Sequence, residues 1–264
     1  MPFDRNDTIE WYFFDLFAEE KGLIQAVMTR KGGISPHPWA SLNMATSVGD
    51  SRENVLENRR RIQQALGLQK QWFFDVWQVH GINVVATRSP RLPGEPHQKA
   101  DAIMTDHSEV ALLMLFADCV PIFLYDPIHR AIALVHAGWQ GTITRVVQHA
   151  VLRMKDQYGT KPQDLLAGVG PSICQKHYEV GEEVAERVRT EFQESDDLLS
   201  YPENGRAHFD LWQANRQILL ECGLQLHHIQ VAEVCTVEDS SRWYSHRGER
   251  GKTGRFGAVL ALRQ

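Results

Sequence analysis

The stretch VALLMLFADCVPIFLYDPIHRAIALVHAGW, residues 110–139, contains three short apolar runs separated by residues that form turns. The runs cover residues 111–117, 122–125 and 131–136. Pro121 separates the first two runs, and the pair Asp126-Pro127 separates the last two. Short apolar runs bounded in this way are typical of buried strands. The stretch therefore predicts three central strands, and we expect neighbouring ones to form a buried hairpin.

Periodic apolar residues outside this stretch predict helices. Directly after it, apolar side chains recur at helical spacing from Ile143 to Met154, so a helix is expected to begin near Thr142. Further helices are expected over residues 50–66, 181–192 and 210–222, and further strands over 165–169, 229–234 and 258–262. Asp50 and Asp210 are the expected caps of the first and last of these helices. Because strands cluster as well as alternate with helices, the pattern predicts a mixed αβ layered fold rather than a regular βαβ series.

The composition indicates a globular protein, and its charge balance favours small-molecule chemistry. The chain has 264 residues, of which 43% are hydrophobic and 23% charged, which excludes disordered, collagen-like and coiled-coil classes. Its 28 Lys and Arg residues against 33 Asp and Glu residues give a formal net charge of −5. This balance argues against nucleic acids and anionic membranes as partners. A small-molecule substrate is the expected partner, and the sequence leaves the oligomeric state open.

The lack of a recognisable targeting signal and the spacing of the cysteines predict a cytoplasmic protein. The first fourteen residues, MPFDRNDTIEWYFF, include acidic residues and lack the apolar core of a signal peptide. The most apolar stretch, residues 110–125, contains Asp118 and Pro121 and is shorter than the roughly 20 residues that span a bilayer. The four cysteines are Cys119, Cys174, Cys222 and Cys235. They are widely spaced and form no CxxC pair, so we expect free thiols in a reducing compartment.

Two phosphate-binding motifs fail on spacing. The segment Gly-Lys-Thr at residues 251–253 would end a P-loop, but the position of the first P-loop glycine is occupied by His246. The segment Gly-Val-Gly at residues 168–170 begins like a dinucleotide-binding fingerprint, but its third glycine position is occupied by Ile173. The sequence therefore predicts neither a P-loop nor a Rossmann-type dinucleotide site.

Three residues that can bind a metal stand beside predicted strands: His80 in WQVHG, Cys119 in ADCVP and His136 in VHAGW. Two imidazoles and one thiolate suit Zn²⁺, and three protein ligands leave the fourth position open, as in catalytic zinc sites. Separations of 39 and 17 residues match no established zinc signature. The residues alone therefore leave alternatives open. Cys119 could be a small buried side chain beside ordinary core histidines, or a nucleophile with His136 or His80 as general base.

A series of motifs resembles the YfiH-like family. The motifs are Thr29-Arg-Lys-Gly-Gly, Ser41-Leu-Asn43, Gln78-Val-His80-Gly, Ala100-Asp-Ala-Ile, Ala117-Asp-Cys119-Val-Pro, His136-Ala-Gly-Trp139-Gln-Gly-Thr, Gly170-Pro-Ser-Ile, Cys235-Thr, Trp243-Tyr-Ser-His-Arg and Thr253-Gly-Arg255. The similarity runs from about residue 27 to residue 262, so a single YfiH-like domain is expected over residues 1–264. The chain departs from the usual pattern at Lys31, Ser172 and His246, and none of these is one of the three candidate ligands.

The resemblance implies a fold, a metal and a set of activities. Members have been described as multicopper polyphenol oxidoreductases or laccase-like proteins, and as purine nucleoside phosphorylases and adenosine deaminases. The implied fold is α+β, a four-layer αββα sandwich with mixed sheets, related to cysteine deamidase toxins. The implied metal is zinc, or copper, at His80, Cys119 and His136, which would also be the catalytic residues. The implied transferase reaction is phosphorolysis of adenosine, inosine or methylthioadenosine to the base and (methylthio)ribose 1-phosphate, and the implied hydrolase reaction is deamination of adenosine to inosine.

Phosphorolysis requires an anion site. The resemblance points to Arg30 for a bidentate contact with phosphate and to Asn43 for a hydrogen bond to phosphate or ribose. The expected helix start near Thr142 would add backbone N–H groups. We expect Trp139 to pack beneath its loop rather than to stack on a purine. The loop histidines, expected to be ordinary surface residues, are His177, His208 and His246.

Three alternatives remain beside the nucleoside enzyme. A hydrolase or amidase with Cys119 as nucleophile would use one histidine and leave the second unexplained. A copper-dependent polyphenol oxidase would need paired HxH ligands, and no two of the 12 histidines are separated by one residue. A ligand-binding scaffold without activity would not explain three polar residues at strand ends.

Overall fold

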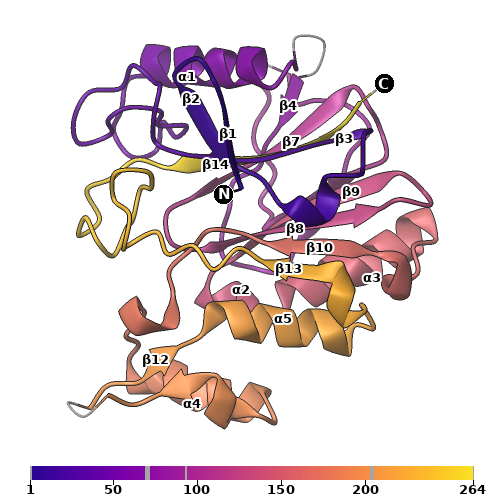
Figure 1. Ribbon diagram of the computed structural model, residues 1–264, viewed down its shortest axis with the longest axis vertical. Coiled ribbons are helices and arrows are strands. Elements are labelled where there is room, and N and C mark those ends of the chain that lie inside the picture. The colour runs from indigo at the N-terminus through magenta and orange to yellow at the C-terminus, as the bar shows by residue number, and fades with distance from the viewer. Residues whose placement is uncertain (1, 69–71, 93, 203–204, 264) are drawn as a thin grey trace.

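The computed structural model describes residues 2–68, 72–92, 94–202 and 205–263, and its strands form two six-stranded sheets and a two-stranded ribbon (Figure 1). The first sheet contains, in spatial order, β1 (Phe3–Asn6), β2 (Ile9–Tyr12), β3 (Leu23–Met28), β14 (Phe256–Leu262), β7 (Val110–Phe116) and β4 (Trp72–Phe74). The second contains β13 (Ile229–Val231), β10 (Leu166–Val169), β8 (Val120–Asp126), β9 (Ala131–Ala137), β6 (Ala102–Thr105) and β5 (Val84–Ala86). The ribbon pairs β11 (Leu199–Ser200) with β12 (His208–Phe209).

Helices cover the outer faces of both sheets, so the chain forms four layers (Figure 1). On the first sheet lies α1 (Arg52–Ala65), whose Ile62 shares a buried cluster with Ala26 and Val259. On the second sheet lie α2 (Trp139–Ile143), α3 (Val146–Tyr158) and α5 (Leu211–Glu221), whereas α4 (Glu182–Glu191) packs against α2, farther from the sheet (Figure 1). No helix within the described ranges is long and apolar enough to cross a bilayer. The expected α+β fold with αββα layering is confirmed.

Strand β9 contributes to two cores. Ile132 and Leu134 face the first sheet and join a buried cluster with Phe123 of β8. Ala133 and Val135 alternate with them and face the helices. Because successive side chains point to opposite faces and both faces are buried, the strand is apolar at nearly every position. Burial on both faces explains why residues 110–139 contain continuous apolar runs rather than an alternating apolar and polar pattern.

The helices agree with the sequence prediction except at one break. α1, α4 and α5 lie where helices are expected, and Asp210 caps α5 with a side-chain hydrogen bond to its backbone. Ser51, rather than Asp50, caps α1, because the Ser51 side chain accepts the hydrogen bond from the first turn. The single helix expected over residues 142–154 is wrong. Arg145 adopts a left-handed backbone conformation, with φ of 60°, and this separates α2 from α3.

The three predicted central strands are present but divide between the sheets. β8 and β9 form the expected antiparallel hairpin, with Ile122 opposite Val135. β7 instead pairs with β14 in the first sheet. The chain passes from one sheet to the other at Asp118, whose φ is 84°, and Cys119 follows directly. Strands β10, β13 and β14 lie in the expected regions, whereas β1 to β6 are short and carried no clear sequence signal.

The core between the two sheets is expected to dominate stability. Leu134→Ala removes a fully buried side chain from it and should lower the free energy of unfolding by about 2–5 kcal/mol. The matched control is Leu152→Ala on α3, because Leu152 is 49% exposed and its replacement should change stability by no more than about 0.5 kcal/mol. Urea denaturation followed by tryptophan fluorescence measures both values. Equal losses for the two variants would contradict this assignment of the core.

Candidate active site

His80, Cys119 and His136 lie together at one end of the two sheets. Their ligand atoms all lie within 4.8 Å of one another, and Cys119 Sγ is 3.8 Å from His80 Nε2. His80 follows β4 of the first sheet, Cys119 precedes β8, and His136 lies in β9 of the second sheet. The structure thus brings together three residues that are far apart in the sequence. We name them the His-Cys-His cluster.

A glycine makes this close approach feasible. Gly138 follows β9 directly, and a Cβ atom at this position would lie 2.9 Å from Cys119 Sγ and 2.9 Å from His80 Cδ2. Real Cβ atoms essentially never approach other heavy atoms so closely. Any larger residue would push the thiol and the imidazole away from His136. The glycine of the HAGW motif is therefore required by the packing of the cluster.

Asp101 holds both histidines in place. Its fully buried carboxylate accepts hydrogen bonds from the backbone N–H groups of Val79 (3.1 Å), His80 (2.9 Å) and Gly81 (2.7 Å). The same carboxylate lies 2.9 Å from Nδ1 of His136. An ionised carboxylate can only accept, so His136 Nδ1 carries the proton and Nε2 is left for the cluster. This is the arrangement by which a carboxylate orients a metal-binding histidine.

Asp118 holds the turn that precedes Cys119 in place. Its carboxylate accepts hydrogen bonds from the Thr236 hydroxyl and the Arg247 backbone N–H, both at 2.6 Å. Its carbonyl oxygen accepts the N–H of Ile173 at 3.0 Å. Three separate segments therefore hold the strained turn that presents the thiol of Cys119.

The cluster favours a charged thiolate. Burial opposes ionisation of Cys119, but the charge of His136 and hydrogen bonds from His136 and His80 outweigh it and lower the pKa of Cys119 to about 6. Burial also opposes the charge on His136, but the Cys119 thiolate and Asp101 outweigh it and raise the pKa of His136 to about 9. Without a metal, the pair is therefore a thiolate and an imidazolium between these two pH values.

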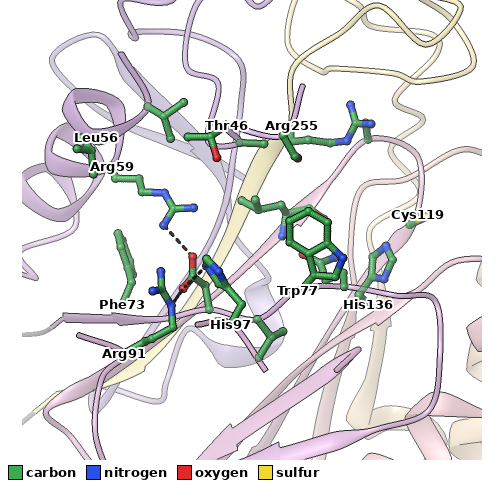
Figure 2. A pocket seen from close by; sticks show the side chains of 18 of the residues that line it. Thr46, Leu56, Arg59, Phe73, Trp77, Arg91, His97, Cys119, His136 and Arg255 are labelled. Atoms are coloured by element: carbon green, nitrogen blue, oxygen red, sulfur yellow. Dashed lines mark hydrogen bonds and ion pairs between the residues drawn. The ribbon is translucent and has the colours of Figure 1, made fainter. Parts of the chain in front are cut away.

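A large cavity of about 1130 Å³ opens beside the cluster. Figure 2 shows Trp77, Cys119 and His136 at one end and Arg59 and Arg91 at the other. The basic residues that line it are Arg52, Arg59, Arg60, Arg91, Arg247, Arg255, His97 and His246. At the far end Asp75 pairs with Arg59 and Arg91 at 2.8 Å and 2.7 Å. The acidic residues of the lining are Asp75, Glu95 and Asp118, so the cavity combines a cysteine-histidine centre with a wall on which basic residues outnumber acidic ones.

Arg255 and Arg247 are the lining arginines that interact with the turn formed by Asp118 and Cys119. Within the described part of the chain, no carboxylate lies within ion-pair distance of either guanidinium, which is also true of Arg52, whereas Arg59, Arg60 and Arg91 are paired. Burial lowers the pKa of Arg255, while the negative charges of Cys119 and Asp118 oppose this effect. The Arg247 guanidinium donates to the carbonyl of Glu179 at 3.0 Å and lies over the Tyr178 ring. An anion in the cavity would meet both arginines without displacing a carboxylate.

Arg30 and Asn43 do not line this cavity. The Arg30 guanidinium donates to Glu249 at 3.1 Å and to the carbonyl of Ala40 at 2.8 Å, and it lies over the ring of Tyr244. Asn43 is fully buried, and its side-chain oxygen accepts the backbone N–H of Arg255 at 2.9 Å. Both side chains therefore support the segment that carries Arg255.

The other sequence predictions near the site have mixed outcomes. The helix start expected near Thr142 lies at Trp139 instead, in the five-residue α2, and neither residue lines the cavity. Trp139 packs against the helical core, as expected. Of the three loop histidines, His246 lines the cavity, whereas His208 bonds the carbonyl of Gln175.

The residues that sequence reasoning missed include Asp101, Asp118, Arg247 and Arg255. All four stand inside motifs that resemble the family, but none received a role. An isolated acid before an apolar strand was the available signal for Asp101. Arg255 had no comparable signal, because its place beside Cys119 depends on contacts between segments distant in sequence.

The Asp101 carboxylate is expected to control the reactivity of Cys119. In protein stripped of metal, alkylation of Cys119 should accelerate as pH rises through about 6, since the thiolate forms there. Asp101→Asn removes a charge that stabilises the His136 imidazolium, so the midpoint should move to higher pH. Iodoacetamide labelling followed by peptide mass spectrometry measures the midpoint.

A matched control comes from the other end of β8. Asp126 is also fully buried and also bonds a histidine, His129, at 2.8 Å, so Asp126→Asn should leave the Cys119 midpoint unchanged. Cys222 is an internal control for the labelling reaction, because burial raises its pKa to about 11 and it should therefore stay unreactive near pH 6. An unchanged midpoint in Asp101→Asn would show that Asp101 does not act through His136.

Comparisons with known proteins agree with the motif resemblance. The sequence model of the multi-copper polyphenol oxidoreductase laccase family matches residues 24–263. The chain is 33% identical over 250 residues to purine nucleoside phosphorylase YlmD of Bacillus subtilis, covering 92% of this chain and 90% of the relative. It is 38% identical to a purine nucleoside phosphorylase of Deinococcus radiodurans, covering 90% and 88%.

Solved structures show the same fold. The crystal structure of YlmD from Geobacillus stearothermophilus superposes with a TM-score of 0.91 at 33% identity, covering 100% of this chain and 99% of that chain. The crystal structure of Bacillus licheniformis hypothetical protein YfiH gives a TM-score of 0.88 at 28% identity, covering 99% of each chain. The chain therefore belongs to the multi-copper polyphenol oxidoreductase laccase family, the YfiH-like family that its motifs indicate.

Proposed function

We propose that the protein is a purine nucleoside phosphorylase that cleaves adenosine, inosine or methylthioadenosine with inorganic phosphate. The observation that carries the proposal is the pairing, in one cavity, of the His-Cys-His cluster with the Arg255 and Arg247 guanidinium groups. The names of the relatives support the same reaction class. We expect the reaction to take place in the cytoplasm.

The cluster has the donor set of a metal site. His80 offers Nε2, Cys119 a thiolate and His136 Nε2, while Asp101 holds the proton on the other ring nitrogen of His136. Two imidazoles and one thiolate fit zinc and also accept copper. We propose zinc as the resident ion. When bound, zinc would supply Lewis acidity beside the substrate, which is also the chemistry that deamination of adenosine to inosine requires.

The cavity wall offers groups that fit both reactants, the purine nucleoside and the phosphate. Trp77 is 54% exposed and lines the cavity with Tyr178, so these flat rings offer a stacking surface for a purine. Arg255 and Arg247 would hold phosphate through charge-assisted hydrogen bonds. A phosphate oxygen then bonds to C1′ of the ribose as the bond between C1′ and the base nitrogen breaks. The base leaves with the electron pair and takes up the proton that phosphate loses.

Arg30 and Asn43 have a supporting part in this scheme. Asn43 binds the backbone of Arg255, and Arg30 binds Glu249 in the same segment. We propose that they position Arg255 for phosphate, in place of the direct phosphate contact that the resemblance implies. Their replacement would then alter phosphate binding only through Arg255.

A cysteine hydrolase is the second candidate, because one observation favours it. The low pKa of Cys119 and the raised pKa of His136 describe a thiolate-imidazolium pair, as in cysteine nucleophiles. This candidate predicts amide hydrolysis that is independent of phosphate and is abolished by loss of Cys119. A copper-dependent polyphenol oxidase is the third reading and predicts oxygen consumption with phenols.

The first test is the dependence of product formation on phosphate. Zinc-loaded protein incubated with adenosine should release adenine and ribose 1-phosphate only when phosphate is present, whereas inosine should form with or without phosphate. Cys119→Ala should lower both rates by more than about 100-fold, because loss of a ligand exceeds the 10–100-fold cost of losing a residue that only orients one. Chromatography separates the products.

The control is Cys222→Ala, since Cys222 lies outside the cavity and should be dispensable for activity. The phosphorylase proposal would be overturned if adenosine, inosine and methylthioadenosine all remained uncleaved with phosphate. Hydrolysis of an amide or oxidation of a phenol by the same preparation would then favour the corresponding alternative.

The second test asks which arginine binds phosphate. Arg255→Gln should raise the KM for phosphate by about 10–100-fold with little change in the KM for the nucleoside, since it removes one charge-assisted contact. Arg153→Gln is the matched control, because Arg153 is exposed on α3, away from the cavity lining. A larger effect of Arg30→Gln than of Arg255→Gln, in protein of unchanged melting temperature, would instead assign the phosphate contact to Arg30.

A further inference from the structure

A second group of metal-binding side chains lies outside the cavity. Cys174, His177 and Cys235 have ligand atoms that all lie within 4.8 Å of one another. His177 Nδ1 is 3.2 Å from Cys174 Sγ and 3.6 Å from Cys235 Sγ. None of the three lines the cavity. We name them the Cys-His-Cys cluster.

Two segments distant in sequence build this cluster. Cys174 precedes the short 3₁₀ helix Gln175–His177 after β10, His177 is the last residue of that helix, and Cys235 follows β13. A parallel bridge pairs Ser172 with Cys235, and the N–H of Cys174 donates to Cys235 Sγ at 3.4 Å. Backbone pairing therefore brings the two thiols to one point without help from a disulfide, since all four cysteines are free.

We propose that the Cys-His-Cys cluster is a second metal site and that it binds Zn²⁺. In a tetrahedral zinc centre with Zn–S of about 2.3 Å and Zn–N of about 2.05 Å, a nitrogen and a sulfur ligand lie about 3.6 Å apart. The distances of 3.2 Å and 3.6 Å from His177 Nδ1 are close to this value. Two thiolates and one imidazole are a donor set that selects zinc over harder cations.

A fourth ligand is available at the surface. Glu238 Oε1 lies 3.7 Å from His177 Nδ1 and 3.4 Å from Lys176 Nζ, and its side chain is 52% exposed, so turning toward the cluster would exchange a surface ion pair for a metal bond. Cys235 is buried, and Cys174 and His177 are half-buried. A site with three or four protein ligands, closed on the inner side, is typical of structural rather than catalytic zinc.

The position of the cluster indicates what such an ion would do. Ile173, next to Cys174, donates its N–H to the carbonyl of Asp118, and Thr236, next to Cys235, donates its hydroxyl to the carboxylate of Asp118. Asp118 presents Cys119 to the cavity. Zinc would therefore hold together two of the three segments that bind the turn before Cys119. This role is separate from the reaction and would stand even if the proposed function failed.

The test is metal stoichiometry in the full-length Cys119→Ala protein, which removes the contribution of the His-Cys-His cluster. Reduced protein is stripped with chelator, loaded with zinc, gel-filtered and analysed by mass spectrometry of the metal. We expect Cys119→Ala to retain one zinc per chain. Adding Cys174→Ser and Cys235→Ser should abolish that zinc, whereas adding Cys222→Ser should not change it. A zinc-free Cys119→Ala protein, or zinc that persists without Cys174 and Cys235, would overturn the second site.

A second measurement avoids variants of the Cys-His-Cys cluster that fail to fold. In Cys119→Ala protein, zinc should slow alkylation of Cys174 and Cys235 and leave that of Cys222 unchanged, as read by peptide mass spectrometry. Equal labelling of all three with and without zinc, or isolation of Cys174 and Cys235 as a disulfide that zinc does not prevent under reducing conditions, would refute metal binding. Wild-type protein that holds no more zinc than Cys119→Ala would count against the first site alone.

Discussion

The candidate active site depends on one buried carboxylate. Asp101 receives the backbone N–H groups of the loop around His80 and the Nδ1 proton of His136, so a loop that follows the first sheet is tied to a strand of the second. Burial raises the pKa of this carboxyl, but hydrogen bonds from His136 and the loop hold it below its ordinary value. A buried charge of this kind is stable only while every partner stays in place. The positions of His80 and His136 in the His-Cys-His cluster therefore follow from the hydrogen bonds that the buried Asp101 carboxylate requires.

The four-layer architecture determines where this chemistry can occur. The core between the sheets is closed by aromatic and aliphatic side chains, so polar groups can gather only where strands end and the chain changes sheets. Asp118 and Cys119 occupy that crossing between β7 and β8. The turn is strained, and partners from distant segments hold it, which is typical of functional positions. Gly138 then permits the thiol, His80 and His136 to meet.

The same atoms account for the differing descriptions of this family. A cysteine thiolate between two histidines can bind a soft metal ion, and without the ion it is an activated nucleophile beside an imidazolium. The family name refers to copper and phenol oxidation, whereas the curated relatives are named for nucleoside phosphorolysis. In the proposed function, Arg255 is the residue that favours phosphorolysis, because it lines the cavity without a carboxylate partner among the described residues and phosphate needs an anion site, whereas phenol oxidation does not.

The sequence by itself determined the local elements and the three residues of the cluster. Helices α1, α4 and α5 and the hairpin of β8 and β9 follow from apolar periodicity and from turn and cap residues, which act over a few positions. The division of the central strands between two sheets, the break at Arg145 and the role of Asp101 were decided only by the tertiary structure. The same holds for Arg30, whose guanidinium binds Glu249, 219 positions away. Local pattern specifies which side chains are apolar, but the partner of a buried charge is chosen by the packing of the whole chain.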